Sequence, residues 1–207
     1  ILSMRSVGSK LDPRIRRVLG EHGALVRAGQ LFDEGIHPRV LYALRNSGQL
    51  EQVAHGLYRL ASAPFPAHFD LLVVAQRAPK AVVCLISALA FHELTDEIPH
   101  EVSIALPRGS ATPKLETPPV RAFHFSDAAY RLGIEHHKVD GVDLKVYSPA
   151  KSIVDAFRFR NRIGEDVAIK ALTNGLRDRR VRPGALLELA GQLRARSVME
   201  PYVRALA

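Results

Sequence analysis

Two prolines in a short polar segment divide this chain more sharply than any other feature. They belong to Ser62-Ala63-Pro64-Phe65-Pro66. Proline lacks the backbone N–H that a helix interior or a central strand needs, so the segment fits neither and is predicted to be a linker. A chain of 207 residues has room for one or two domains. We therefore expect two, at residues 1–62 and 63–207.

The first part has the element order of a winged helix-turn-helix. A helix is expected from Asp12-Pro13, where an N-cap precedes proline at N1. The other expected elements are a helix at Val26–Glu34, a helix opening at His37-Pro38 and ending at Asn46-Ser47-Gly48, and strands at Leu50–Ala54 and Leu57–Leu60 joined by His55-Gly56. Three short helices followed by a hairpin are typical of that DNA-binding motif.

The third helix is the candidate recognition helix. Helical spacing puts Val40, Leu41 and Leu44 on its inner face. The residues left facing outward are Arg39, Tyr42, Ala43, Arg45 and Asn46. Arginine and asparagine can pair with guanine and adenine edges in the major groove, and a tyrosine hydroxyl can bind phosphate. The alternative is an ordinary solvated helix, but the element order favours recognition.

Charge is unevenly distributed along the chain. The net charge is +8 in total, with +4 over residues 1–62, −2 over 63–150 and +6 over 151–207. Two basic parts are typical of proteins that bind polyanions, most often nucleic acid, although solvated surface arginines give the same count. Arg177, Arg179, Arg180 and Arg182 form a basic cluster that is either a solvated turn or an anion site.

The second part reads as a mixed α/β domain. The expected elements are a helix at Ala67–Arg77, a short strand or helix start at Ala81–Cys84, a helix at Ser87–Leu94, strands at Glu101–Leu106, Val120–Phe125, Ile134–Val139 and Val142–Tyr147, a helix after Ser148-Pro149, and helices at Asp166–Leu176, Pro183–Arg194 and Val198–Leu206. Asp140-Gly141 is a strong hairpin turn signal. The fold class expected for the whole chain is α+β, with a small sheet and a helical C-terminal tail.

No catalytic or metal-binding motif stands out. A single cysteine, Cys84, rules out a disulfide framework and a cysteine-based zinc site. His136-His137 followed by Asp140 and Asp143 suggests a metal site, but adjacent strand residues point to opposite faces, so we expect none. His92-Glu93 reads as a helix end rather than a catalytic pair. No cofactor is expected.

Ser152 and Asp155 carry the strongest enzymatic alternative. Three residues apart near a helix start, they could hold a hydroxyl beside a carboxylate. Helix capping and favourable charge at the N-terminal dipole explain the same residues more simply.

Membrane insertion and export are not expected. The longest apolar stretch, Ala81–Phe91, is about half of the roughly 18 residues that span a bilayer. Ile1–Lys10 lacks the apolar region of a signal peptide. The expected location is the cytoplasm.

Several segments in one order resemble the AbiEi-family antitoxins of type IV toxin–antitoxin systems, which are predicted transcriptional regulators of viral defence. The segments are Gly35–Leu44, Gly48–Leu50, Gly56–Leu60, Cys84–Thr95, Ile98-Pro99, Ala105–Gly109, Gly133–Glu135, Ser148–Asp155, Phe159–Gly164 and Val198–Tyr202. They extend over nearly the whole chain. One departure lies in the wing, where relatives usually carry Arg or Lys and this chain has Glu51, Gln52, Ala54 and His55.

The resemblance implies a non-enzymatic repressor and antitoxin. Its winged helix would bind the promoter of its own operon, as a homodimer on double-stranded DNA, and its second domain would counteract a nucleotidyltransferase-like toxin without needing to bind it. The predicted DNA-binding residues are Arg14, Arg16, Arg17, His37, Arg39, Tyr42, Arg45, Asn46, His55 and Arg59. Two alternatives stay open: an enzyme of phosphoryl transfer or nucleic-acid cleavage using Ser152 and Asp155, and an interaction protein that binds the toxin through its C-terminal helices.

Overall fold

The computed structural model describes residues 13–23 and 25–207. The predicted N-cap Asp12 and the segment Ile1–Lys10 lie outside the described residues. The chain divides into two compact units. The N-terminal unit extends to Ala67 and takes in Asp140–Val142, and the second unit comprises His68–Val139 and Asp143–Ala207. Among the described residues, no helix combines the length and apolar character needed to cross a bilayer.

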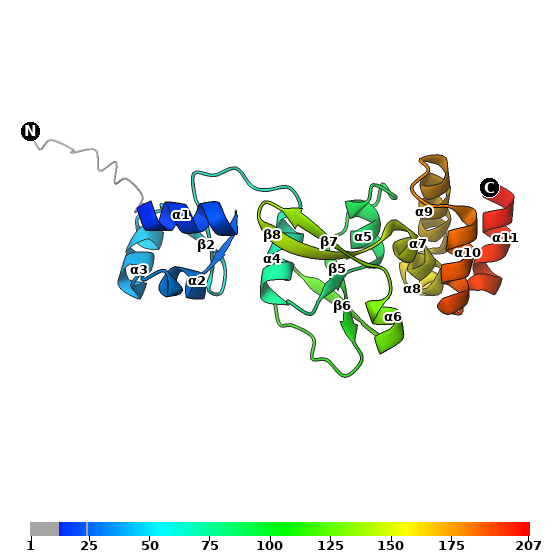
Figure 1. Cartoon of the computed structure of the whole chain (residues 1–207), viewed down its shortest axis with the longest axis horizontal. Helices are drawn as coiled ribbons and strands as arrows, with labels where there is room; N and C mark the ends of the chain where they lie inside the picture. The colour runs from blue at the N-terminus through cyan, green and yellow to red at the C-terminus, as the bar shows by residue number, and fades with distance from the viewer. Residues whose placement is uncertain (1–12, 24) are drawn as a thin grey trace, which may run out of the picture. The chain divides into compact units, whose positions relative to one another are not determined.

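The N-terminal unit contains three helices and a small sheet (Figure 1). The elements are α1 (Pro13–His22), β1 (Val26–Arg27), α2 (Ala28–Asp33), α3 (Pro38–Asn46), β2 (Leu50–Ala54) and β3 (Leu57–Leu60). The sheet order is β1-β3-β2, with both pairs antiparallel. The predicted order of three helices and a hairpin is confirmed, and both hairpin strands have the expected bounds. The second helix is shorter than predicted, because Val26 and Arg27 form a strand instead.

One apolar cluster joins these elements. Its residues come from all three helices and from the sheet: Ile15, Val18, Val26, Leu31, Ile36, Leu41, Leu44, Leu50 and Tyr58. The two ends of α3 follow from local sequence. Pro38 stands in its first turn, and Gly48 adopts a φ of +73° just after it, so that the Gln49 N–H can donate to the Leu44 carbonyl at 2.9 Å.

The second unit is built on a mixed five-stranded sheet. Its strands are β4 (Val82–Val83), β5 (Val102–Pro107), β6 (Val120–Phe125), β7 (Ile134–Val139) and β8 (Val142–Tyr147). The order is β6-β5-β4-β8-β7; β5 is parallel to β6, and β4 is antiparallel to β5 and parallel to β8. The strand predicted at Glu101–Leu106 is present, but Val102 to Leu106 are all buried, because helices cover both faces there. The side chains on both faces of β5 are therefore buried, and no alternation of buried and exposed residues is seen.

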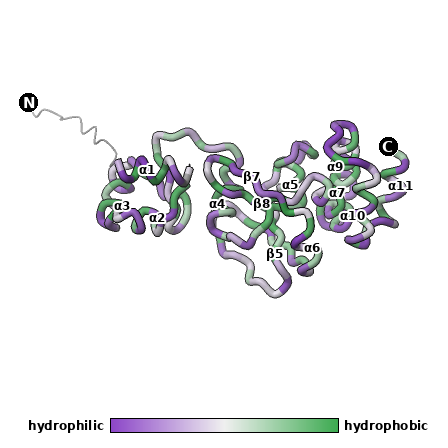
Figure 2. Tube along the Cα trace, in the orientation of Figure 1, coloured by the Kyte–Doolittle hydropathy of each residue, from purple (hydrophilic) through white to green (hydrophobic). Residues whose placement is uncertain are grey.

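Helices complete this unit. They are α4 (Phe69–Arg77), α5 (Leu85–Phe91), α6 (Asp127–Arg131), α7 (Pro149–Arg158), α8 (Arg160–Ile163), α9 (Glu165–Arg177), α10 (Pro183–Gln192) and α11 (Arg196–Leu206). Helices α7, α9, α10 and α11 pack together as a group that ends the chain (Figure 1). Hydrophobic residues run along β5, β8 and α7 (Figure 2). The fold is α+β, as the sequence predicts, although α6 is not anticipated by it.

Candidate nucleic-acid interface

Helix α3 has one buried face and one polar face. Leu41 and Leu44 are 0% and 9% exposed and anchor the helix to the core of the N-terminal unit. The opposite face exposes Arg39, Tyr42, Ala43, Arg45 and Asn46, as predicted. Val40 was predicted to face inward, but it is 38% exposed, because the helix buries only the narrow stripe of its two leucines. Helix α3 therefore presents a continuous polar surface.

Neutral groups hold Arg45 in place. Its guanidinium donates to the amide oxygen of Asn46 at 3.2 Å and to that of Gln52, on β2, at 3.3 Å. The same group lies over the Tyr42 ring, 5.2 Å from the centroid. Amides and an aromatic face orient a guanidinium without neutralising it, so Arg45 keeps a full positive charge at the surface.

His37 forms the N-cap of α3. Its Nδ1 accepts a hydrogen bond from the Arg39 backbone N–H at 3.2 Å. In the neutral ring this assigns the proton to Nε2, which can donate to an anion. A helix N-terminus also attracts phosphate through its free N–H groups and its dipole.

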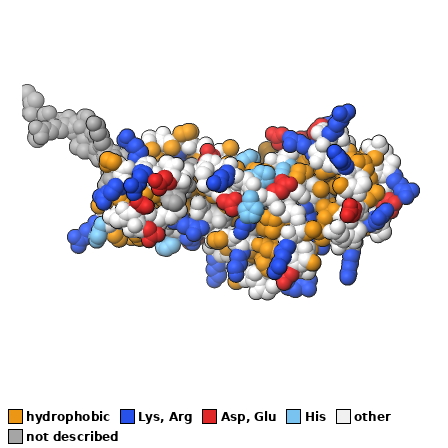
Figure 3. Space-filling model, in the orientation of Figure 1, with side chains coloured by type: hydrophobic (Ala, Val, Ile, Leu, Met, Phe, Trp, Pro, Cys, Tyr) orange, Lys and Arg blue, Asp and Glu red, His pale blue; other side chains and the backbone are white. Residues whose placement is uncertain are grey.

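The arginines of the N-terminal unit differ in whether they are paired with an acidic side chain. Several arginine side chains stand on the visible face of this unit, among hydrophobic and acidic ones (Figure 3). Arg17 is paired with Glu34 and lies 3.8 Å from Glu21, so its charge is largely compensated inside the protein. Arg16 and Arg39 are exposed and form no ion pair with any described residue. Arg14 is exposed too, on the same helix as Arg16.

Arg59 is a correction to the predicted DNA-binding set. Only 3% of it is exposed. Its guanidinium is paired with Glu51, donates to the Ala63 carbonyl and stacks on Phe65, 3.9 Å from the ring centroid. Glu51 stands directly opposite Arg59 across the β2–β3 hairpin. The side chain therefore fastens the start of the linker to the sheet and is not available to a phosphate.

The wing of this unit is short and weakly charged. His55 is exposed at its tip, beside Gly56, whose φ of +66° closes the turn. Glu51 and Gln52 lie on β2 and contact Arg59 and Arg45. Two of the four wing residues that depart from the expected Arg or Lys, Glu51 and Gln52, therefore position arginines.

The second unit buries the residues on which the enzymatic alternative depends. Ser152 and Asp155 are both 0% exposed. The Ser152 hydroxyl donates to the Tyr147 carbonyl at 3.1 Å, and Asp155 is paired with Lys151 and with Arg158. The helix cap is Ser148, whose hydroxyl accepts from the Lys151 N–H at 3.2 Å. These positions offer no accessible hydroxyl or carboxylate.

Lys151 is also fully buried, and its ammonium lies over two aromatic rings. Its Nζ is 4.1 Å from the Tyr147 centroid and 4.7 Å from that of Phe125. Burial lowers the pKa of Lys151, and the Asp155 carboxylate opposes that shift. The segment Ser148–Asp155, part of the family resemblance, thus forms an ion-paired core beneath the sheet.

The C-terminal arginine cluster is only partly free of acidic partners. Arg177 is paired with Asp178 at 2.8 Å, and Arg180 with Glu93 at 3.5 Å. Arg179 and Arg182 are exposed and form no ion pair within the described part of the chain. They line a hollow of about 590 Å³ next to the end of α11.

The histidines considered as metal ligands lie in two different environments. His136 is exposed and its Nδ1 lies 3.0 Å from the Asp143 carboxylate. His137 lies on the other face of β7, beside Glu135 and His92. His92 is the C-cap of α5, as the prediction of a helix end requires. The grouping of His92 with Glu135 and His137 has no signature in the sequence, because α5 and β7 meet only in the folded chain.

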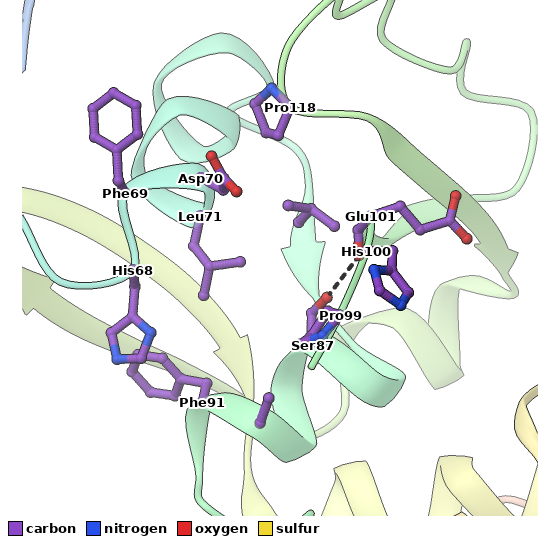
Figure 4. A pocket seen from close by; sticks show the side chains of 12 residues that line it. His68, Phe69, Asp70, Leu71, Ser87, Phe91, Pro99, His100, Glu101 and Pro118 are labelled. Carbon is purple, nitrogen blue, oxygen red and sulfur yellow. Dashed lines mark hydrogen bonds between the residues drawn. The ribbon is translucent and has the colours of Figure 1, made fainter. Parts of the chain in front are cut away.

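A shallow cavity of about 280 Å³ lies between α4, α5 and the start of β5 (Figure 4). Phe91 and His68 pack against each other on one side, with ring centroids 4.9 Å apart and the ring planes tilted by 51°. Ser87 donates to the Glu101 carbonyl at 3.4 Å and accepts from the Ser103 N–H at 2.9 Å, so its hydroxyl is satisfied. The cavity has an aromatic wall and is also lined by Asp70, Glu101 and His100.

Comparison with known proteins is informative for the N-terminal unit. Residues 13–61 match a family described as "Transcriptional regulator, AbiEi antitoxin". The crystal structure of the RV2827C protein from Mycobacterium tuberculosis is similar at 15% identity, with a TM-score of 0.45, over 93% of this chain and 85% of that one. The comparison with curated proteins gives no significant match. The matched segment contains all three helices and the hairpin described above, so the N-terminal unit is similar to the AbiEi antitoxin family of transcriptional regulators.

Proposed function

We propose that this protein is a DNA-binding repressor that places α3 in the major groove of its own promoter. The observation that carries the proposal is the polar face of α3, where Arg39 and Arg45 have no carboxylate partner among the described residues, whereas Arg17 and Arg59 are each paired with a glutamate. Arginine pairs bidentately with guanine, and asparagine with adenine. Arg39, Arg45 and Asn46 are therefore the proposed readers of base edges.

Phosphate contacts would fix the orientation of α3. His37 and the N-terminus of α3 form one proposed contact, and Arg14 and Arg16 on α1 form another. Tyr42 and His55 are exposed and can each reach a phosphate from the helix and from the wing. Arg17 is given a smaller role than the sequence suggests, and Arg59 none.

Two such units usually act as a pair. A short recognition helix contacts few base pairs, and helix-turn-helix proteins gain affinity by binding two half-sites about one helical turn apart. We therefore propose a homodimer on an inverted repeat, acting in the cytoplasm. Residues 1–62 would be the DNA-binding domain and residues 63–207 a non-enzymatic antitoxin domain.

Neutralisation of a toxin is the second part of the proposal, and it rests on the family. The toxin would be a nucleotidyltransferase-like protein encoded next to this chain. Coexpression with the neighbouring gene tests it: growth should be rescued by this chain and lost without it. Copurification of the two proteins would indicate direct binding, and rescue without copurification would indicate the indirect route.

A second basic surface extends the DNA-binding proposal. Of the four arginines predicted there, Arg179 and Arg182 have no acidic partner within the described residues, so these two are the proposed phosphate contacts.

Fluorescence anisotropy tests the repressor directly. The full chain is titrated against a duplex from its own upstream region and against a scrambled duplex of equal length, at several salt concentrations. A specific repressor should prefer the upstream duplex by about a thousandfold or more. Equal affinity for both duplexes would reduce the chain to a basic surface and refute the proposal.

A further inference from the structure

Three potential metal ligands converge on one side of the second unit. His92 ends α5, while Glu135 and His137 are two residues apart on β7 and so share a face of that strand. One donor atom from each residue can be chosen so that all three lie within 4.8 Å of one another. The two imidazole rings have centroids 5.9 Å apart.

The hydrogen bonding of His92 leaves it ready to bind a cation. Its Nε2 lies 2.8 Å from the Tyr147 carbonyl oxygen, which can only accept, so Nε2 carries the proton and Nδ1 carries the lone pair. Metal-bound histidines commonly donate their second ring N–H to a backbone carbonyl in this way, which fixes the tautomer and the ring orientation. The ring is only 9% exposed.

His137 supplies an independent observation. Its Nε2 is buried and has no hydrogen-bond partner among the described residues, although a Glu135 carboxylate oxygen lies 3.3 Å away. The carboxylate is within ion-pair distance but makes no hydrogen bond to this nitrogen, and an ion bound by both groups would satisfy the nitrogen. The Phe91 ring packs beside His137, with centroids 4.9 Å apart, and also lines the cavity of Figure 4.

We propose that His92, Glu135 and His137 form a binding site for a divalent transition-metal ion, with zinc as the best fit. Two imidazoles and one carboxylate suit zinc better than magnesium or calcium, which prefer oxygen donors throughout. In a tetrahedral site with zinc bonds of about 2.0–2.1 Å, the donor atoms lie about 3.3–3.4 Å apart. The side chains therefore need to close by up to about 1.5 Å from the present limit of 4.8 Å. Three protein ligands leave a fourth position for water or another donor.

Zinc titration of the tag-free full chain tests this site. The protein is stripped with a chelator, dialysed, and titrated with Zn²⁺ in a calorimeter. We expect one ion per chain and a higher Tm in the presence of zinc. Glu135→Gln and His137→Ala should each weaken binding at least about tenfold, since even indirect supports of metal ligands contribute that much.

Matched controls separate this cluster from adventitious binding. His136→Ala removes the neighbouring histidine on the opposite face of β7, and His124→Ala removes one on β6; neither should change the affinity. Glu135→Gln keeps the size of the side chain, so it decides the matter if His137→Ala does not fold. No heat of binding, or an equal loss in the His136→Ala and His124→Ala variants, would overturn the proposal and leave Glu135 and His137 as an ordinary ion pair.

Discussion

Replacing Asp155 with alanine should destabilise the second unit severely. Lys151 and Asp155 are both 0% exposed, and Asp155 also accepts from Arg158 at 2.6 Å. Removing one partner of a buried ion pair leaves an uncompensated charge and typically costs about 3–5 kcal/mol. For a protein of this size, each kcal/mol corresponds to about 2–4 °C of Tm. The expected loss is therefore about 6–20 °C.

Calorimetry or circular dichroism melting measures this loss, and two comparison variants make it specific. Arg158→Ala removes the partly exposed partner and should cost only roughly 1–2 kcal/mol, because solvent screens a group that is 25% exposed. Lys151→Met with Asp155→Leu removes both charges and should be closer to the wild type than Asp155→Ala alone.

An Asp155→Ala variant that melts within about 2 °C of the wild type would refute this reasoning. The carboxylate would then not be a structural charge, and a catalytic role for Asp155 would have to be considered again.

Three further predictions concern other sites. Gly133→Ala should destabilise the protein by about 1 kcal/mol or more, because the new Cβ would lie 2.9 Å from the Lys151 Cβ and the backbone φ is +71°. Gly184→Ala, in open space within α10, should be neutral or stabilising. Thermal melts of the two variants test this difference. The hydrogen bond from Lys170 holds the pKa of the Asp96 carboxyl below its ordinary value, so any contribution of this carboxylate to stability is present above the unfolded pKa and lost as pH falls through the folded one. Lys170→Ala should raise that pKa in an NMR titration, and an unchanged value would exclude the pair in solution. Arg179→Ala with Arg182→Ala should reduce the log–log salt slope of DNA binding by up to about 1.8, and an unchanged slope would assign both arginines to a solvated turn.

The N-terminal unit could be predicted closely because its signals are local. Pro38 and Gly48 mark the ends of α3, and His55-Gly56 closes the hairpin at the expected place. Strand β1 could not be found in this way, since it is only two residues long and exists through its pairing of Val26 with Tyr58. Helix boundaries set by capping residues can be recognised in the sequence, whereas elements stabilised by distant partners cannot.

The sequence predicts which residues lie on the outward face of the candidate site, but not which of its arginines are free of acidic partners. The outward face of α3 follows from helical spacing, yet that pattern does not tell which arginines meet a carboxylate. The ion pair of Arg59 could have been predicted, because the hairpin register places Arg59 directly opposite Glu51. The pairing of Arg17 with Glu34 requires the packing of α1 beside α2 and has no local signature.

The buried ion pair and the histidine cluster of the second unit could not be predicted from the sequence. Lys151 and Asp155 are four residues apart, which is the spacing of any exposed helical salt bridge. The pair is buried because the sheet places the aromatic rings of Tyr147 and Phe125 against the Lys151 ammonium. The grouping of His92 with Glu135 and His137 likewise depends on α5 meeting β7.

A comparison of Arg45→Ala with Arg17→Ala on the upstream duplex tests the central claim most directly. Both variants lose one arginine from the N-terminal unit, but only Arg45 is on the polar face of α3 and without a carboxylate partner. We predict that Arg45→Ala weakens binding to the upstream duplex by about 1–3 kcal/mol and reduces the preference over scrambled DNA, while Arg17→Ala leaves that preference unchanged. Equal behaviour of the two variants would show that α3 does not read the DNA sequence.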